Sequence, residues 1–332
     1  TTGGTITFNA GTNDGDIAIS AGAPVSASGA VAFNSGANGS VTVGANVTST
    51  GASISMTGGG AAESITINVG STVNANTSLT LSSGTVNNDG AVLSGTTTTV
   101  TATTFDNDGS VAAGTTVTLN ATTVDNSTGS TITGATGVTT NSTTVTNAGS
   151  ITATTGTLQI NASTVNNNAG GLLEASAGNV NFEAPGALAV NLGAGSNINA
   201  IGAGNDVSFN PATSGAITIA GAGDGNISAA DQVILNGGAG AVLANLNQVT
   251  GTITGSGAGF SVTTDTGSLT ANTVTATGAV VLNAIGGGLT ATGVSTNTGN
   301  INLTAGIGNM LATTINNTSA AGTTNLSVVA SG

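Results

Sequence analysis

Residues 123–126 read Thr-Val-Asp-Asn, and closely similar four-residue units recur through the middle of the chain. The five copies are Thr85-Val86-Asn87-Asn88, Thr104-Phe105-Asp106-Asn107, Thr123-Val124-Asp125-Asn126, Thr144-Val145-Thr146-Asn147 and Thr164-Val165-Asn166-Asn167. Their apolar second positions are 19 to 21 residues apart. A recurrence of this length is typical of a chain that is built from stacked structural repeats.

Other positions keep the same phase. A pair of residues with i, i+2 spacing precedes each apolar position, as at Val117 and Leu119, and a glycine and a further apolar residue follow it, as at Gly109 and Val111. Near the end of the chain, residues 267–271 are echoed by residues 287–291. This alternation indicates short strands with one inward face, separated by Gly, Asn or Asp corners.

Strands of this kind bury their inward faces when successive coils stack in parallel register. Gly, Thr, Val and Asn are also poor helix formers. The sequence therefore predicts an all-β fold, a right-handed parallel β-helix (β-solenoid) with three-strand rungs of about 20 residues. We expect one continuous solenoid over residues 1–332. Its most regular rungs are expected at residues 79–173 and 267–305, and its looser rungs at residues 1–78 and 174–266.

An asparagine ends each copy of the repeated unit. These residues are Asn88, Asn107, Asn126, Asn147 and Asn167. In parallel register they would stack, and each amide would donate to the amide of the neighbouring rung. A ligand site lined with amides is the alternative, but stacked amides satisfy one another, which favours a structural ladder.

The composition excludes several classes of function. The 332 residues contain no Lys, Arg, His, Cys, Trp or Tyr, and 13 acidic residues set the formal net charge at −13. Without basic side chains the chain lacks the surface that neutralises nucleic-acid phosphates. Without His or Cys it lacks the usual pairs of nucleophile and base, so we expect no enzyme. No run of 18 apolar residues is present, so no helical membrane span is predicted.

The carboxylates are the remaining candidates for a site. Asp106 and Asp125 share one column of the repeat, and Asp89 and Asp108 share another. Like charges one strand spacing apart repel, so the side chains either splay into solvent or bind a cation such as Ca²⁺ through oxygen ligands. Solvated corners are the preferred reading, because Asp is common in turns.

A further candidate calcium ligand is Asp206. Residues 202–207 read Gly-Ala-Gly-Asn-Asp-Val and resemble one copy of the calcium-binding nonapeptide of RTX toxins, in which ligands come from tandem copies. Calcium is the only cofactor that the sequence suggests, with Asp89, Asp106, Asp108, Asp125 and Asp206 as its candidate ligands.

Residues 124–135 and 145–153 resemble the rungs of filamentous-haemagglutinin-type adhesins. These are large secreted bacterial β-helix proteins that include two-partner-secretion and autotransporter passengers. The resemblance covers residues 79–173 and 267–305, and the chain departs from the family in lacking every basic residue. It implies a protein that is secreted and lies outside the cell or on its surface.

These observations predict a structural or adhesive extracellular rod, either a filament subunit or an adhesin stalk. Open solenoid ends expose strand edges, so we expect the chain to assemble head to tail with itself and to contact host or environmental surfaces. One alternative is a carbohydrate-binding or carbohydrate-processing passenger. A second alternative is a calcium-stiffened component of a surface layer.

Overall fold

The computed structural model describes residues 4–211 and 215–328, so the first three and last four residues of the predicted solenoid lie outside the described residues. In the described part the chain is all-β, without a helix, and its strands pair in parallel as stacked coils. These coils form a β-solenoid of about 15 turns, which confirms the predicted fold class. Contacts divide the chain into two units, Thr1–Gly156 and Thr157–Gly332. The hand of the coil and the prediction of a single domain stay predictions.

The first unit contains β1 to β19. Their bounds are β1 Ile6–Asn9, β2 Ile17–Ile19, β3 Val25–Ala27, β4 Val31–Asn34, β5 Val41–Val43, β6 Val47–Ser49, β7 Ile54–Thr57, β8 Ser64–Ile67, β9 Thr72–Ala75, β10 Leu79–Ser82, β11 Thr85–Asn88, β12 Ala91–Ser94, β13 Thr98–Asn107, β14 Ser110–Ala113, β15 Thr116–Asn126, β16 Thr131–Gly134, β17 Gly137–Asn141, β18 Thr144–Asn147 and β19 Ser150–Ala153.

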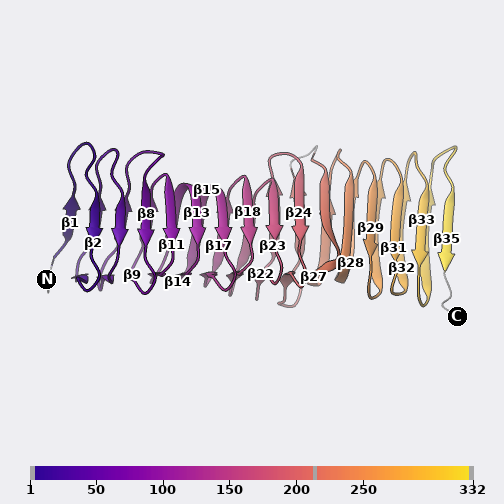
Figure 1. Cartoon of the computed structure of the whole chain (residues 1–332). Coiled ribbons are helices and arrows are strands. Elements are labelled where there is room, and N and C mark those ends of the chain that lie inside the picture. Colours follow the sequence, from indigo (N-terminus) through magenta and orange to yellow (C-terminus); the bar gives the residue numbers. More distant parts are fainter. Residues whose placement is uncertain (1–3, 212–214, 329–332) are drawn as a thin grey trace. The chain divides into compact units, whose positions relative to one another are not determined.

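The strand pairings form three parallel ladders through this unit. Figure 1 shows the strands of successive turns side by side. In the second of them β11 pairs with β8 and β13, which places Val86 opposite Ile65 and Phe105. Val124 and Val145 continue the same column. The apolar positions that recur in the sequence therefore stack directly on one another, as predicted.

The second unit contains β20 to β35. Their bounds are β20 Thr157–Asn161, β21 Thr164–Asn167, β22 Leu172–Ala175, β23 Val180–Ala184, β24 Leu188–Leu192, β25 Asn197–Ala200, β26 Val207–Pro211, β27 Ile217–Asn236, β28 Val242–Gly257, β29 Phe260–Thr264, β30 Leu269–Ala276, β31 Val280–Ala284, β32 Leu289–Thr296, β33 Ile301–Ala305, β34 Met310–Asn317 and β35 Thr324–Val328.

From β29 onward each turn of this unit holds two strands instead of the three that we predicted, because β30, β32 and β34 continue through a corner. The residue at that corner has a positive φ in each turn: 54° at Thr273, 72° at Gly293 and 55° at Thr314. A left-handed residue turns the chain sharply without ending the strand pairing on either side. The corner is therefore built into one long strand.

Turn length varies along the chain. Hydrogen-bonded side chains of adjacent turns are 19 residues apart at Asn88 and Asn107, 25 apart at Asn166 and Asn191, and 29 apart at Asn197 and Asn226. Surface loops absorb the extra residues, because loop length costs little free energy once the strands are paired. The period of about 20 residues thus describes the regular turns and not every turn.

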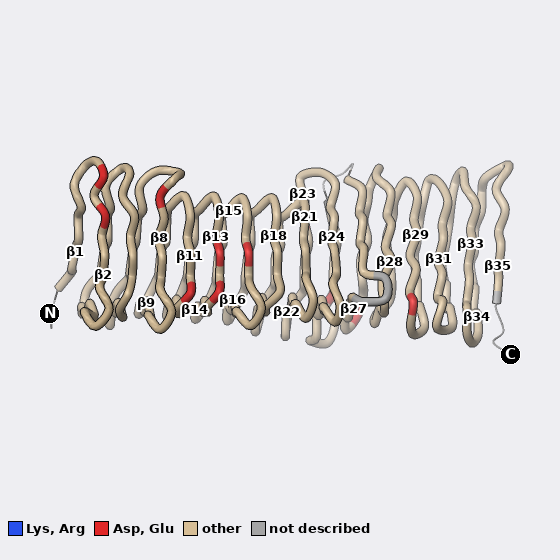
Figure 2. Tube along the Cα trace, in the orientation of Figure 1, with Lys and Arg blue, Asp and Glu red and all other residues tan. Residues whose placement is uncertain are grey.

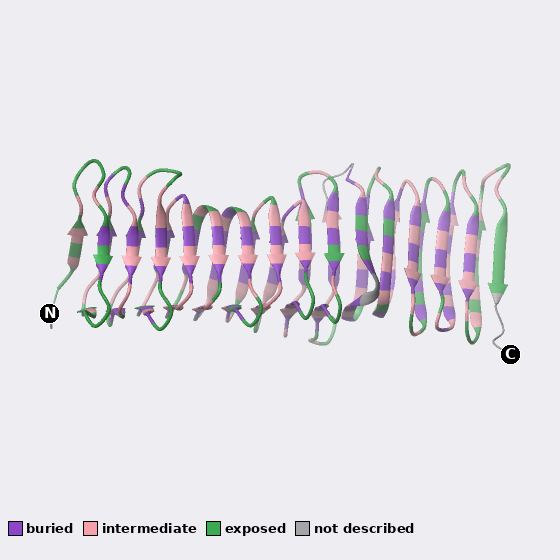
Figure 3. Ribbon diagram, in the orientation of Figure 1, coloured by how far each residue is buried: buried purple, intermediate pink, exposed green. Residues whose placement is uncertain are grey.

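The core is a narrow stack of aliphatic side chains inside the coils. Figure 3 shows buried and partly exposed residues alternating along the strands. Five of the six phenylalanines, Phe33, Phe105, Phe182, Phe209 and Phe260, are almost completely buried. Two ring pairs stack across turns, Phe8 on Phe33 and Phe182 on Phe209, with ring centroids 4.9 and 4.7 Å apart. Burial of this apolar surface is the main stabilising contribution to each turn.

Candidate functional site

The buried asparagines of the first unit form a ladder. Asn88 Nδ2 donates to Asn107 Oδ1 at 2.7 Å, Asn107 Nδ2 to Asn126 Oδ1 at 2.7 Å, and Asn126 Nδ2 to Asn147 Oδ1 at 2.8 Å. All four side chains are fully buried. They end β11, β13, β15 and β18, where the chain leaves the second ladder of strands and turns towards the third.

The ladder amides also donate hydrogen bonds to backbone carbonyls of the next turn. Asn88 Nδ2 donates to the carbonyl oxygen of Ser110 at 3.1 Å, and Asn126 Nδ2 donates to that of Ser150 at 3.3 Å. These carbonyls belong to the first residues of β14 and β19, one turn further on. The ladder therefore ties two faces of the coil together. Because its amides are buried and bonded to one another, this arrangement supports the structural role over a ligand site.

The first residue of the ladder, Asn88, has a side-chain oxygen without a hydrogen-bond partner. Asn88 lies opposite Ile67 of the preceding turn, and its Oδ1 atom is buried without a hydrogen-bond partner. A buried polar atom left unpaired costs about 1–3 kcal/mol. In the second unit Asn167 lies opposite Leu192, and its Nδ2 donates to the carbonyl oxygen of Gly171 at 3.0 Å.

A second set of asparagine pairs, which the repeat pattern did not predict, lies on outward faces. Asn34 donates to Asn9 at 2.8 Å, Asn141 to Asn120 at 2.7 Å, and Asn325 to Asn302 at 2.7 Å. Their separations of 21 to 25 residues differ from pair to pair, so no column was visible in the sequence. A search for asparagines that share a column within aligned turns would have found Asn120 and Asn141.

Four carboxylates gather beside the ladder, where Figure 2 shows acidic residues around β11, β13 and β15. Asp106 lies directly opposite Asp125 in the parallel register. Burial raises the pKa of Asp106 above its ordinary value, and the charges of Asp108, Asp125 and Asp89 raise that pKa further. Burial also raises the pKa of Asp125, with a smaller contribution from the charge of Asp108.

The remaining calcium candidate, Asp206, belongs to the second unit. One of its carboxylate oxygens accepts a hydrogen bond from the backbone N–H of Gln232 at 3.0 Å, and its own N–H donates to Asn179 Oδ1 at 2.9 Å. Among the side chains that the structure describes, which leave out Asp224, no group of three or more His, Cys, Asp or Glu is placed to hold a metal ion. Calcium binding by these aspartates stays a prediction.

The two raised pKa values predict how stability depends on pH. The folded protein binds more protons than the unfolded chain between the ordinary carboxyl value of 3.8 and the raised values, so the free energy of unfolding falls as pH rises through that range. We expect a higher melting temperature near pH 4 than near pH 7. Asp125→Asn should raise the melting temperature at pH 7 by about 1–2 °C, because it removes a like-charge pair.

Differential scanning calorimetry over this pH range measures both effects. Asp265→Asn is the matched control, since it removes one negative charge from the second unit. A pH dependence that is the same in Asp125→Asn and in the unmodified protein would contradict the assignment to the Asp106 and Asp125 pair.

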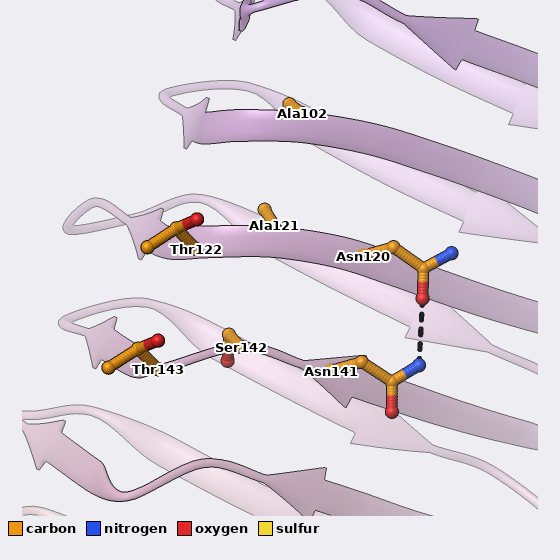
Figure 4. Close-up of a pocket in the computed structure, with 7 residues that line it drawn as sticks. All are labelled: Ala102, Asn120, Ala121, Thr122, Asn141, Ser142 and Thr143. Atoms are coloured by element: carbon orange, nitrogen blue, oxygen red, sulfur yellow. Dashed lines mark hydrogen bonds between the residues drawn. The ribbon is translucent and has the colours of Figure 1, made fainter.

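A groove runs across five successive turns of the first unit. One hollow of about 340 Å³ is lined by Ala102 with residues 120–122 and 141–143, as Figure 4 shows. A second hollow of about 280 Å³ is lined by residues 59–61, 82–84 and 101–103. Both hollows are shallow and meet at Ala102, and together we call them the small-residue groove.

The groove has a floor of small side chains between two polar banks. In Figure 4 Ala102, Ala121 and Ser142 lie in the middle, with Asn120 and Asn141 on one side and Thr122 and Thr143 on the other. Parallel register aligns the asparagine bank, since Ser82, Thr101, Asn120 and Asn141 form one column. The repeat pattern in the sequence did not predict this groove.

No family model matches the chain, and no match was found among curated proteins or solved structures. No helix in the described part of the chain has the length and apolar character needed to cross a membrane. The function is therefore argued from the fold and from the geometry of these polar features.

Proposed function

We propose that this chain is a non-catalytic structural or adhesive rod of a secreted protein, a filament subunit or adhesin stalk at the cell surface. The stacking of the strands into parallel ladders supports this proposal, because the backbone hydrogen bonds and the buried amides join each turn to the next. The resemblance to filamentous-haemagglutinin-type adhesins supports the extracellular location. Antibody labelling of intact producing cells tests that location, and signal only after permeabilisation would overturn it.

The proposal includes head-to-tail assembly. Leu326, on the last strand, is 55% exposed, although it lies opposite Leu303 of the preceding turn, which is 1% exposed. The edge of β35 pairs on one side with β33. Among the described residues no strand pairs with its other edge, and both that edge and the exposed Leu326 side chain are covered when another turn stacks on them. We propose that the first turn of a second copy supplies it, which makes an open fibre.

Electron microscopy of the purified chain over a range of concentrations tests this assembly. Filaments that lengthen with concentration are the expected result. Leu326→Asp should abolish them, whereas Leu243→Asp, which alters a 43% exposed leucine within β28, should not. Separate particles of one size at every concentration would overturn the assembly proposal, as would filaments that persist in Leu326→Asp.

A further inference from the structure

The small-residue groove has the chemistry of a binding surface for an uncharged polyhydroxylated ligand. No acidic residue lines either hollow, and the chain has no basic residue, so all polar groups of the groove are amides, hydroxyls and backbone atoms. The net charge of −13 works against acidic polymers, and the neutral lining provides no partner for a cationic ligand.

The banks carry polar groups that are free to bind. Asn120 uses its Oδ1 to accept from Asn141, while its Nδ2 has no partner among the described residues. The hydroxyls of Thr101, Thr122 and Thr143 likewise make no hydrogen bond within the described part of the chain, and all three threonines are exposed. Donors and acceptors therefore line both sides of a floor at which Ala102 is partly exposed and Ala121 is 5% exposed.

This cross-section matches a sugar ring. The C–H face of a pyranose would lie on the partly exposed methyl group of Ala102, and its equatorial hydroxyls would meet Asn120 on one bank and Thr122 on the other. The polar groups repeat with the spacing of parallel strands, about 4.8 Å. An equatorially linked pyranose chain advances by nearly this distance per sugar. An extended peptide advances by about 3.3 Å per residue and falls out of step with the turns.

We propose that the small-residue groove binds a neutral, extended glycan along the solenoid, with one sugar ring per turn. The chain has no Trp or Tyr to stack on a sugar, so each ring contributes little affinity and binding depends on several turns acting together. This proposal is independent of head-to-tail assembly, because the groove lies within the first unit.

Linear β-1,4-linked glucose oligomers of two to six sugars are suitable probes, and isothermal titration calorimetry is the measurement. We expect the dissociation constant to fall at least tenfold between the disaccharide and the pentasaccharide, and to change little with the sixth sugar because the groove spans five turns. An oligomer of an acidic sugar of the same length should bind at least tenfold more weakly.

Two alanine variants distinguish the groove from the rest of the surface. Ala102→Leu fills the point that both hollows share and should remove the dependence on oligomer length. Ala112→Leu places the same side chain at a comparably exposed position on β14, outside the groove, and should bind as the unmodified chain does. Thr122→Val, which keeps the side-chain shape, should weaken binding about threefold to tenfold, a loss of one hydrogen bond.

Absence of binding by every oligomer at millimolar concentration would overturn the proposal. Binding that does not depend on length, or that Ala102→Leu leaves intact, would overturn it as well. Electron microscopy of the same variants separates the two proposals, because the groove variants should form filaments as the unmodified chain does.

Discussion

Asn107→Ala should lower the free energy of unfolding by about 3 kcal/mol. The substitution removes two buried hydrogen bonds between ladder amides, at 2.7 Å each. It leaves the Nδ2 of Asn88 and the Oδ1 of Asn126 without their Asn107 partner. Each buried polar group left unpaired costs about 1–3 kcal/mol, and the vacated volume adds to the loss. Urea unfolding followed by circular dichroism measures the effect.

Asn88→Ala is the matched control from the end of the same ladder. Its Oδ1 already lacks a partner, so truncation removes one ladder bond together with one unsatisfied atom. We expect a loss about half as large as that for Asn107→Ala. Equal losses for the two variants would show that the hydrogen bonds between turns contribute little and that only side-chain volume matters.

Gly109→Ala should also destabilise the first unit by about 3 kcal/mol. A Cβ atom at this position would lie 2.0 Å from the carbonyl oxygen of Gly90 in the preceding turn. That oxygen accepts the N–H of Ser110 at 2.9 Å, a bond that joins the two turns directly before the pairing of β12 with β14 begins. Relief of the clash requires the two turns to separate, and overpacking of this kind costs about 1–3 kcal/mol or more.

Gly60→Ala is the control, because a Cβ atom there would meet only the carbonyl oxygen of Ala37, at the ordinary contact distance of 3.5 Å. A change within about 0.5 kcal/mol is expected. The same urea titration compares both variants. A Gly109→Ala protein as stable as Gly60→Ala would mean that the turns are not packed as closely as the structure places them.

The head-to-tail assembly and the glycan groove make different demands on the chain. Assembly depends on the last strands, where Leu326 is exposed, whereas glycan binding depends on a column of neutral side chains around Ala102. A protein with both would present a repeating binding surface along a fibre, so that weak contacts with single sugars add up over many copies.

The sequence by itself determined the stacking. Val86, Phe105 and Val124 recur at a nearly constant interval because parallel in-register pairing places each directly over the last, so the repeat in the sequence is the register of the sheet. The buried ladder from Asn88 to Asn147 follows from the same rule, since residues in one phase of the repeat occupy one column.

Only the tertiary structure decided what the outward residues do. Alternation along a strand shows that Asn120 and Thr122 point away from the core, but not that a corner brings them to opposite banks of one groove. The angle of that corner results from the packing of three strand faces around the core, which is a property of many residues at once. The tertiary structure also decided the length of each turn. Loops of the second unit are longer without disturbing the paired strands, so the sequence of one turn does not show how many residues separate it from the next.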